Sequence, residues 1–294
     1  MLTILRVLLL FVCVIGTASA QESTRRVYVS ALDNNGNSID DLTAEDFTVK
    51  EGGKTRTITR VEPALAKMQI AIIVDDNGTG LFRVAVARFI EALLGRAEFS
   101  ISTVTGQTLK LVDFTTSSQE LSQAVQKLGA RPGVNDGGQL LDGITQTSLD
   151  MARRGAGRPI ILALTVGGDE VTPIAPHDAL DQLRRSGAAL HVVSVLNSAM
   201  RATAPTTRPS DLLNENLGLH VVLGDGPKRS GGHREEVSAM AGVSTGLEKL
   251  AEQLKHQYVI EYSLDEGKLF DRITLGVTRK GVTLRAPTHV PDKN

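Results

Sequence analysis

Hydrophobic and polar positions change their spacing twice along the chain. Between residues 25 and 62 they alternate with period two, which is typical of strands with one buried face. With NNGN and EGGK as turns, this zone is predicted to contain three short strands: VYVSAL, DFTVKE and TRTITRV. Short strand patterns return between residues 257 and 285, in QYVIEYSL, DRITLGVT and GVTLRA.

The middle zone, from residue 68 to about 255, alternates between continuous apolar runs and helical patterns. Runs rich in Val, Ile and Leu that do not alternate indicate strands buried on both faces. The predicted strands are MQIAIIV, FSISTV, LKLVDF, PIILALT and ALHVVSVL. The predicted helices are FRVAVARFIEALLGRA, SQELSQAVQKL, LLDGITQTSLDMARR and PHDALDQLRRSG. This alternation predicts an α/β fold with a doubly wound, mostly parallel sheet.

After Leu196 the alternation ends. The Pro/Thr/Asn-rich stretch that follows, together with GDGPKRSGGH, predicts a surface insertion over about residues 197–232 whose last part is a flexible loop. One helix, REEVSAMAGVSTGLEKLAEQLKHQ, is expected next.

The two terminal zones are each too small to form a core alone. We therefore expect the strands of residues 25–62, within an N-terminal segment over 21–66, to pair with a C-terminal segment over 256–288. Together they would form one small β module, with the α/β domain of residues 67–255 inserted between them.

The first twenty residues predict export. MLTILR supplies a cation, VLLLFVCVI is an apolar core and TASA is a small-residue cleavage pattern. The apolar run is too short to span a bilayer. We expect a signal peptide over residues 1–20, with an uncleaved anchor as the alternative, and no membrane span in the mature chain. Cys13 is the single cysteine, so the mature chain would form no disulfide, which favours a bacterial periplasmic or secreted protein.

Charge and aromatic content argue against two classes of partner. The formal net charge is −1, so there is no basic excess for nucleic acid or an anionic membrane. Tryptophan is absent and aromatics make up 3% of the chain, which argues against a stacking platform for sugars or single-stranded nucleic acid. Another protein is the expected partner.

The strand MQIAIIV runs directly into the polar stretch DDNGTG. In open α/β sheets, ligands bind beyond the carboxyl ends of the strands. Asp75, Asn77 and Thr79 place a carboxylate, an amide oxygen and a hydroxyl at alternate positions there, and hard divalent cations prefer such oxygen ligands. Alone this is a weak signal, because Asp, Asn and Gly are also common turn residues.

Several stretches, in this order and spacing, together resemble the von Willebrand factor type A (VWA) domain, and in particular exported VWA-related proteins of acidobacteria. MQIAIIVDDNGTG resembles the strand that leads to the family's Asp-x-Ser-x-Ser metal motif. GGQLLDGI resembles its Gly-Gly-Thr-x-Leu-x-Asp-Ala segment, and PIILALTVGGDE resembles its strand ending in Leu-Thr-Asp-Gly. DLTAEDFTVKEGGKTRTITRVEP, QYVIEYS and GVTLRAP resemble the terminal strands. The resemblance implies a Rossmann-like fold whose carboxyl edge recognises other proteins through a bound metal ion.

The same resemblance implies that the metal site is degenerate. The family takes an Asp and two Ser from the first loop, a Thr from the second and an Asp from the third. Asp75 matches, while Asn77 and Thr79 are tolerable replacements. With Asp142 aligned on the family aspartate, the second-loop threonine falls at Gly138, which has no side chain.

The third-loop aspartate falls at Val166, which cannot bind metal, and Asp169 could replace it only if the loop were rearranged. One sure carboxylate does not readily offset the dehydration of an ion such as magnesium.

We therefore expect an exported, non-enzymatic protein-interaction module with a degenerate, metal-free ion-dependent adhesion site and no cofactor. Binding is expected through loops around residues 76–82, 133–139 and 166–174. Besides the three remnant ligand positions, the possible contact residues are Asp76, Gly80, Gln139, Asp169 and Glu170.

Two other functions stay open. One is an adhesion protein that still binds Mg²⁺ or another divalent cation. The other is an exported hydrolase that uses the strand-end carboxylates, although no second catalytic group is recognisable near Asp75. The histidines do not show metal-ligand spacing: His233 is expected in a solvated loop, and His191 is expected to be a buried or edge histidine.

Overall fold

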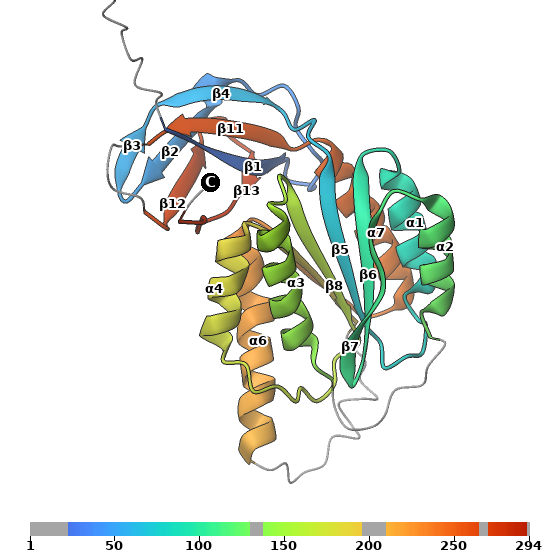
Figure 1. Cartoon of the computed structure of the whole chain (residues 1–294). Helices are drawn as coiled ribbons and strands as arrows, with labels where there is room; N and C mark the ends of the chain where they lie inside the picture. Colours follow the sequence, from blue (N-terminus) through green and yellow to red (C-terminus); the bar gives the residue numbers. More distant parts are fainter. Residues whose placement is uncertain (1–22, 130–137, 196–209, 265–269, 293–294) are drawn as a thin grey trace, which may run out of the picture.

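The structure, a computed structural model, describes residues 23–129, 138–195, 210–264 and 270–292. It contains a large α/β part and a smaller β module (Figure 1). In the described part of the chain, no helix is long and apolar enough to cross a membrane.

A six-stranded sheet with the order β10-β9-β8-β5-β6-β7 forms the centre of the α/β part. Its strands are β5 (Met68–Asp75), β6 (Ala97–Thr105), β7 (Gln107–Thr115), β8 (Pro159–Thr165), β9 (Ala189–Val195) and β10 (Arg234–Val237). All neighbours pair in parallel except β6 and β7, which form an antiparallel hairpin at the edge. The strand order reverses between β5 and β8: β6 and β7 follow on one side of β5, and β8, β9 and β10 follow on the other, as in doubly wound folds. The predicted fold class is thus confirmed.

Helices cover both faces of this sheet (Figure 1). On one face lie α1 (Arg83–Leu93), α2 (Ser118–Lys127) and α7 (Met240–Lys255), and on the other lie α3 (Leu140–Arg154), α4 (Pro176–Ser186) and α6 (Ser210–Ser230).

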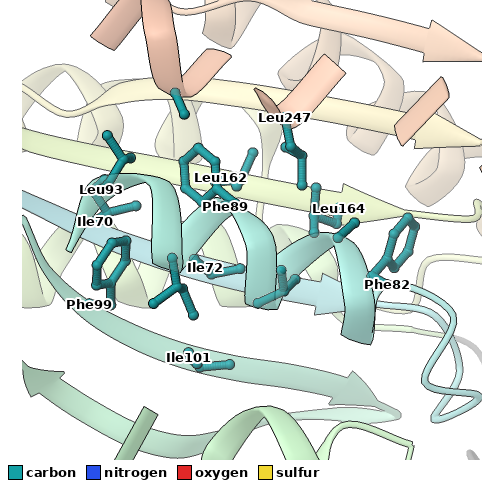
Figure 2. Packing of buried hydrophobic residues seen from close by; sticks show 14 of the residues in the cluster. Ile70, Ile72, Phe82, Phe89, Leu93, Phe99, Ile101, Leu162, Leu164 and Leu247 are labelled. Atoms are coloured by element: carbon teal, nitrogen blue, oxygen red, sulfur yellow. The ribbon is translucent and has the colours of Figure 1, made fainter. Parts of the chain in front are cut away.

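Helix α1 shows why the sequence forms this layer. Its buried residues recur at helical spacing, so they make one apolar stripe: Ala85, Val86, Phe89, Ile90 and Leu93. Figure 2 shows Phe89 and Leu93 packed over sheet residues such as Ile70. A residue such as Phe89, which is 1% exposed, would cost about 3–5 kcal/mol of stability if it were truncated to alanine.

The segment after β9 differs from its prediction. Helix α6 occupies Ser210–Ser230, so the predicted surface insertion, and the flexible loop within it, are wrong over these residues. The helix has a poor sequence for its structure, including Pro227, but Leu219, Val222 and Leu223 pack into the core cluster with α4 and β9. Tertiary burial therefore outweighs weak helix propensity here. The rest of the predicted insertion, up to residue 209, lies outside the described residues.

Strand β10 is a second correction, because its sequence REEV was expected to begin a helix. Instead it pairs in parallel with β9 and adds the outer strand of the sheet.

The β module contains two small antiparallel sheets, ordered β13-β1-β11-β4 and β12-β2-β3. Its elements are β1 (Thr24–Leu32), a 3₁₀ helix η1 (Ala44–Asp46), β2 (Phe47–Glu51), β3 (Lys54–Arg56), β4 (Ile58–Pro63), β11 (Tyr258–Ser263), β12 (Ile273–Val277) and β13 (Thr283–Arg285). Strand β1 pairs with β11, and β2 pairs with β12. Apart from the pairing of β2 with β3, every strand pairing of the module joins a strand from the start of the described chain to one from its end.

A buried charge network lies inside this module. The side chains of Arg25 and Glu51 are 1% and 0% exposed and form an ion pair. Arg56 Nη2 lies 3.3 Å from the second Glu51 oxygen. Arg25 also donates to the carbonyl oxygens of Phe270 at 2.9 Å and Pro291 at 3.1 Å. One cluster of charges thus joins the first and last segments of the module.

The module lies against the amino edge of the large sheet. Arg158, immediately before β8, donates to the carbonyl oxygen of Ala64 at 2.9 Å and to the Gln257 amide oxygen at 2.8 Å. The Tyr28 hydroxyl donates to the carbonyl oxygen of Gly157 at 3.2 Å. The carboxyl edge of the sheet is consequently at the opposite end from the module (Figure 1).

Candidate functional site

The carboxyl ends of β5 and β8 lie side by side at the point where the strand order reverses. Asp75, the last residue of β5, is in register with Thr165, the last residue of β8. The Thr165 hydroxyl donates to Asp75 Oδ2 at 2.6 Å, and the Val166 amide donates to the Asp75 carbonyl oxygen at 3.0 Å. Thr165 therefore holds one of the two carboxylate oxygens.

The other carboxylate oxygen faces a glycine on the second loop. A Cβ added to Gly138 would lie 3.5 Å from Asp75 Oδ1, an ordinary contact distance. Gly138 is fixed there by its backbone, because its N–H donates to Asp169 O at 2.7 Å and its carbonyl accepts from Val171 N at 2.8 Å. The second loop reaches Asp75 at this point but brings no side chain to it.

The first loop closes on itself. The Thr79 hydroxyl donates to the Asp76 carbonyl oxygen at 2.8 Å, and the Asp76 carboxylate accepts from Gly78 N at 3.1 Å. Asn77 has a φ of 52°, a left-handed conformation that Asn tolerates better than most residues. Asn77 and Thr79 are exposed, so the tip of this turn faces solvent.

The predicted contact residues divide into two groups. Asp76 and Glu170 are each 1% exposed, so neither side chain can present itself to a partner, and these two assignments are wrong. Gly80, Gln139 and Asp169 are partly exposed at the carboxyl edge. Residues 133–137 of the second predicted loop lie outside the described part of the chain.

Glu170 has a structural role that sequence analysis missed. Its carboxylate accepts from the backbone N–H groups of Leu140 and Leu141, each at 3.1 Å, and so caps the start of α3. The residue at the usual capping position, Gln139, makes no such side-chain bond. Because the cap comes from 30 residues away, no local N-cap pattern could have indicated it.

Burial dominates the electrostatics of this edge. It raises the pKa of Asp75 to about 6, with the Thr165 hydroxyl acting in the opposite direction and the charge of Asp76 adding to the rise. Burial likewise raises the pKa of Glu170 to about 8, against the two amide hydrogen bonds and together with the charges of Asp75 and Asp142. No Lys or Arg is among the causes of the Asp75 shift within the described residues. The edge is therefore a place where negative charge is costly.

The described side chains do not supply the oxygen shell that magnesium takes, which is six ligands in near-octahedral geometry. Thr165 holds one Asp75 oxygen, Thr79 donates within its own turn, and Gly138 offers no side chain. Val166, at the third predicted ligand position, packs against the core cluster of the α1 face. Within the described residues no group of three or more His, Cys, Asp or Glu side chains could hold a metal ion.

A larger cleft, of about 1170 Å³, lies between the β module and the α/β part. Much of its positive charge is already paired: Arg26 lies 2.7 Å from Glu261, and Arg184 lies 2.7 Å from Asp181 and 2.6 Å from Asp292. Its size alone does not make it a site.

No protein-family model and no curated protein matches the chain. Among solved structures, it is similar to proximal thread matrix protein 1 from the mussel byssus with a zinc-occupied MIDAS motif. The identity is 13% and the TM-score 0.47, over 68% of this chain and 49% of that one. It is also similar to the pilus adhesin SpaC from Lactobacillus rhamnosus GG, at 9% identity and TM-score 0.47 over 86% and 49% of the two chains.

A third similar structure is a von Willebrand factor type A protein from Catenulispora acidiphila, at 12% identity and TM-score 0.44 over 92% and 75% of the two chains. This chain spans about half the length of the mussel and pilus proteins. At such identities and TM-scores these likenesses carry no conclusion about function, and the acidobacterial subgroup stays a prediction. The chain is similar in structure to von Willebrand factor type A proteins.

Proposed function

We propose that this chain is an exported, non-enzymatic protein-interaction module that binds its partner through the carboxyl-edge loops without a metal ion. The observation that carries the proposal is the environment of Asp75. One of its oxygens accepts the Thr165 hydroxyl and the other faces Gly138, so the strand end has the position of a metal site without its donors.

The arrangement of the two parts supports the choice of surface. Because the β module lies against the amino edge, the carboxyl edge is the free end of the sheet (Figure 1). Its loops present Asn77 and Thr79 as exposed residues and Gly80, Gln139 and Asp169 as partly exposed ones. Small polar groups of this kind suit hydrogen bonding to another protein.

Export rests on the leader pattern of residues 1–20, which lie outside the described residues. A partner would then be a periplasmic or extracellular protein.

The hydrolase alternative is weakened by the role of Glu170. A general acid and base must both reach the substrate. Glu170 has the second raised pKa at this edge, but its carboxylate is buried and caps α3. Asp75 and Glu170 are the two acids at this edge with a raised pKa, and the buried Glu170 cannot reach a substrate.

Thermal unfolding tests metal independence. The mature chain, residues 21–294, is heated with millimolar Mg²⁺, Mn²⁺ or Ca²⁺ and then with EDTA. A cation at one hundred times its dissociation constant would stabilise the fold by about 2.7 kcal/mol. For a protein of this size that is roughly 5–10 °C. We expect no shift of that order, and a shift abolished by Asp75→Ala would overturn the proposal.

Gly138→Asp provides a positive control in the same loop. The new carboxylate would lie beside Asp75 Oδ1, because the Cβ is already 3.5 Å away. Two carboxylates at one buried edge repel each other, and a divalent cation relieves that repulsion. This variant should unfold earlier in EDTA and regain stability with cation, which shows that the assay detects a live site.

Site-specific cross-linking tests the surface. A photo-reactive residue replaces Asn77 at the carboxyl edge or, as a control, Leu94 at the far end of α1, which is 44% exposed. Incubation with the exported proteins of the source organism in EDTA should give a discrete adduct from position 77 alone. Equal adducts from both positions, or an adduct that requires divalent cations, would contradict the proposed mode of binding.

A further inference from the structure

A second, smaller pocket of about 290 Å³ lies away from the carboxyl edge, between β9, β10 and α7. Residues of both strands, of α7 and of β13 line it, so it sits where the β module meets the α/β part. Those that carry the argument are His191, His233, Glu235, Lys249, Leu250 and Arg285.

His191 points into this region because of its place on β9. Its neighbours Leu190 and Val192 belong to the core cluster on the α3, α4 and α6 face, and side chains alternate along a strand. His191 therefore faces α7. It is 4% exposed, and neither of its ring nitrogens has a hydrogen-bond partner within the described residues.

An unsatisfied imidazole at this position is costly. A neutral imidazole carries one N–H donor and one acceptor nitrogen. Leaving a buried polar group without a partner costs about 1–3 kcal/mol. Polar pockets with enough room hold water or a ligand that makes the missing bonds. The open nitrogens thus indicate that something other than protein occupies the pocket.

The charged residues around His191 indicate which sign of charge the occupant carries. Arg234, Lys249 and Arg285 supply three positive charges and Glu235 and Glu236 two negative charges, and of these Arg234 and Glu236 pair with each other at 2.5 Å. Burial lowers the pKa of His191 to about 3 and that of His233 to about 4, so both imidazoles are neutral near pH 7. The pocket has an excess of one positive charge and suits a single negative charge.

Among the described residues, Arg285 keeps N–H donors that can hold an anion. It donates one N–H to the Gln253 amide oxygen at 2.6 Å, and a guanidinium has five N–H donors in a planar fork. That fork matches a carboxylate. Lys249 is partly committed, since its ammonium donates to Asn35 O at 2.8 Å.

The pocket also has an apolar wall and a size limit. Leu250 and Val193 line one side of it. Glu235 is held close to α7, because a Cβ on Gly246 would lie 2.7 Å from its Oε2. A volume of about 290 Å³ is at the low end of ligand pockets, which suits a few heavy atoms rather than a nucleotide.

We propose that this pocket binds a small organic carboxylate, whose anionic end lies between Arg285 and the His191 N–H and whose short apolar part contacts Leu250. Inorganic phosphate fits less well, because its second negative charge exceeds the excess charge of the pocket and leaves the apolar wall bare. This site is independent of the function proposed for the carboxyl edge.

Imidazole NMR of the ¹⁵N-labelled mature chain tests the proposal, with butyrate, inorganic phosphate and n-butylammonium as probes. Butyrate should shift the His191 resonances in a saturable way and leave those of the exposed His177 unchanged. n-Butylammonium should shift neither. No saturable shift with any probe would mean that water alone fills the pocket, and saturation by phosphate alone would overturn the carboxylate class.

Matched variants locate the site. Arg285→Gln should weaken butyrate binding at least tenfold, and Lys249→Gln, at an exposed position that does not threaten folding, should weaken it severalfold. Arg279→Gln, which removes an arginine paired with Asp41 on the surface of the same module, should not change it. Unchanged binding in both pocket variants would overturn the site even if butyrate binds.

Discussion

Replacing Glu51 with glutamine removes the negative charge that Arg25 and Arg56 both contact inside the β module. Arg25 and Arg56 flank Glu51, and the three side chains are 1%, 3% and 0% exposed respectively. Glutamine keeps the volume of the side chain and one carbonyl acceptor. The variant therefore removes the buried counter-charge of Arg25 and one of the contacts of Arg56, and it changes little else.

The expected cost follows from burial. Breaking a buried ion pair by removing one partner costs about 3–5 kcal/mol, because the remaining charge is buried without compensation. An exposed pair contributes only about 0–1 kcal/mol. The pair of Arg26, which is 56% exposed, and Glu261 supplies that comparison on the same strand. At about 2–4 °C per kcal/mol, Glu51→Gln should lower Tm by roughly 6–20 °C, against less than about 4 °C for Arg26→Gln.

Circular dichroism during heating measures both variants. Because Arg25 also donates to the carbonyl oxygens of Phe270 and Pro291, the loss should loosen both ends of the module together. Amide exchange in β1 and β12 should therefore accelerate in parallel in Glu51→Gln. A Glu51→Gln protein that melts within the range of Arg26→Gln would refute the argument that buried charge holds the module.

Three further predictions concern the carboxyl edge. Gly129→Ala should lower the urea midpoint more than Gly95→Ala does. Both glycines have φ near 80°, so the backbone strain is the same in the two variants. A Cβ at residue 129, however, would lie 2.7 Å from the backbone of Gly80, whereas a Cβ at residue 95 meets nothing within 4 Å. Asp75→Asn should be stabilising relative to wild type at pH 7 by up to about 3 kcal/mol but not at pH 4. The reason is that the raised folded pKa of about 6 penalises the folded state as pH rises from about 4 through 6, and urea titrations at several pH values measure the difference. Glu170→Ala should cost about 2–4 kcal/mol in the same assay, because it leaves two amides at the start of α3 without acceptors.

The strands of the large sheet could be predicted because their signal is local. MQIAIIV and PIILALT are continuous apolar runs, and the structure buries almost every residue of β5 and β8. Helix α6 could not be predicted, because three glycines and Pro227 interrupt its sequence and the residues that hold it in place lie on other elements. Gly226 illustrates this, because a Cβ there would lie 2.8 Å from Leu190 of β9. The glycine therefore allows α6 to pack closely against β9 and does not mark a loop.

In the candidate site, too, one residue could be predicted from the sequence and its partners could not. Asp75 could be selected from sequence because it ends an apolar run, where parallel strands place their ligands. The hydroxyl that holds it, on Thr165, is 90 residues away, and the carboxylate that caps α3 is 30 residues from its amides. Such partners leave no periodic pattern. Sequence analysis therefore assigned Glu170 to the surface when tertiary structure places it inside.

The two proposed sites share no side chain, and this sets an expectation for how they interact. Ligand in the His191 pocket would contact Arg285 of β13 and residues of α7, which in turn donate to the turn around Asn35 and Gly36 of the β module. It would stabilise the junction between the two parts, whereas the loops around Asn77 are at the opposite edge of the sheet (Figure 1). Coupling between sites requires an element whose state both ligands change. The pocket is lined by β9, β10, α7 and β13, whereas Asn77 lies in the loop after β5, so the two ligands would contact different elements. Butyrate should therefore raise the Tm without changing the yield of cross-links from position 77; a changed yield would mean that the sheet itself transmits the effect.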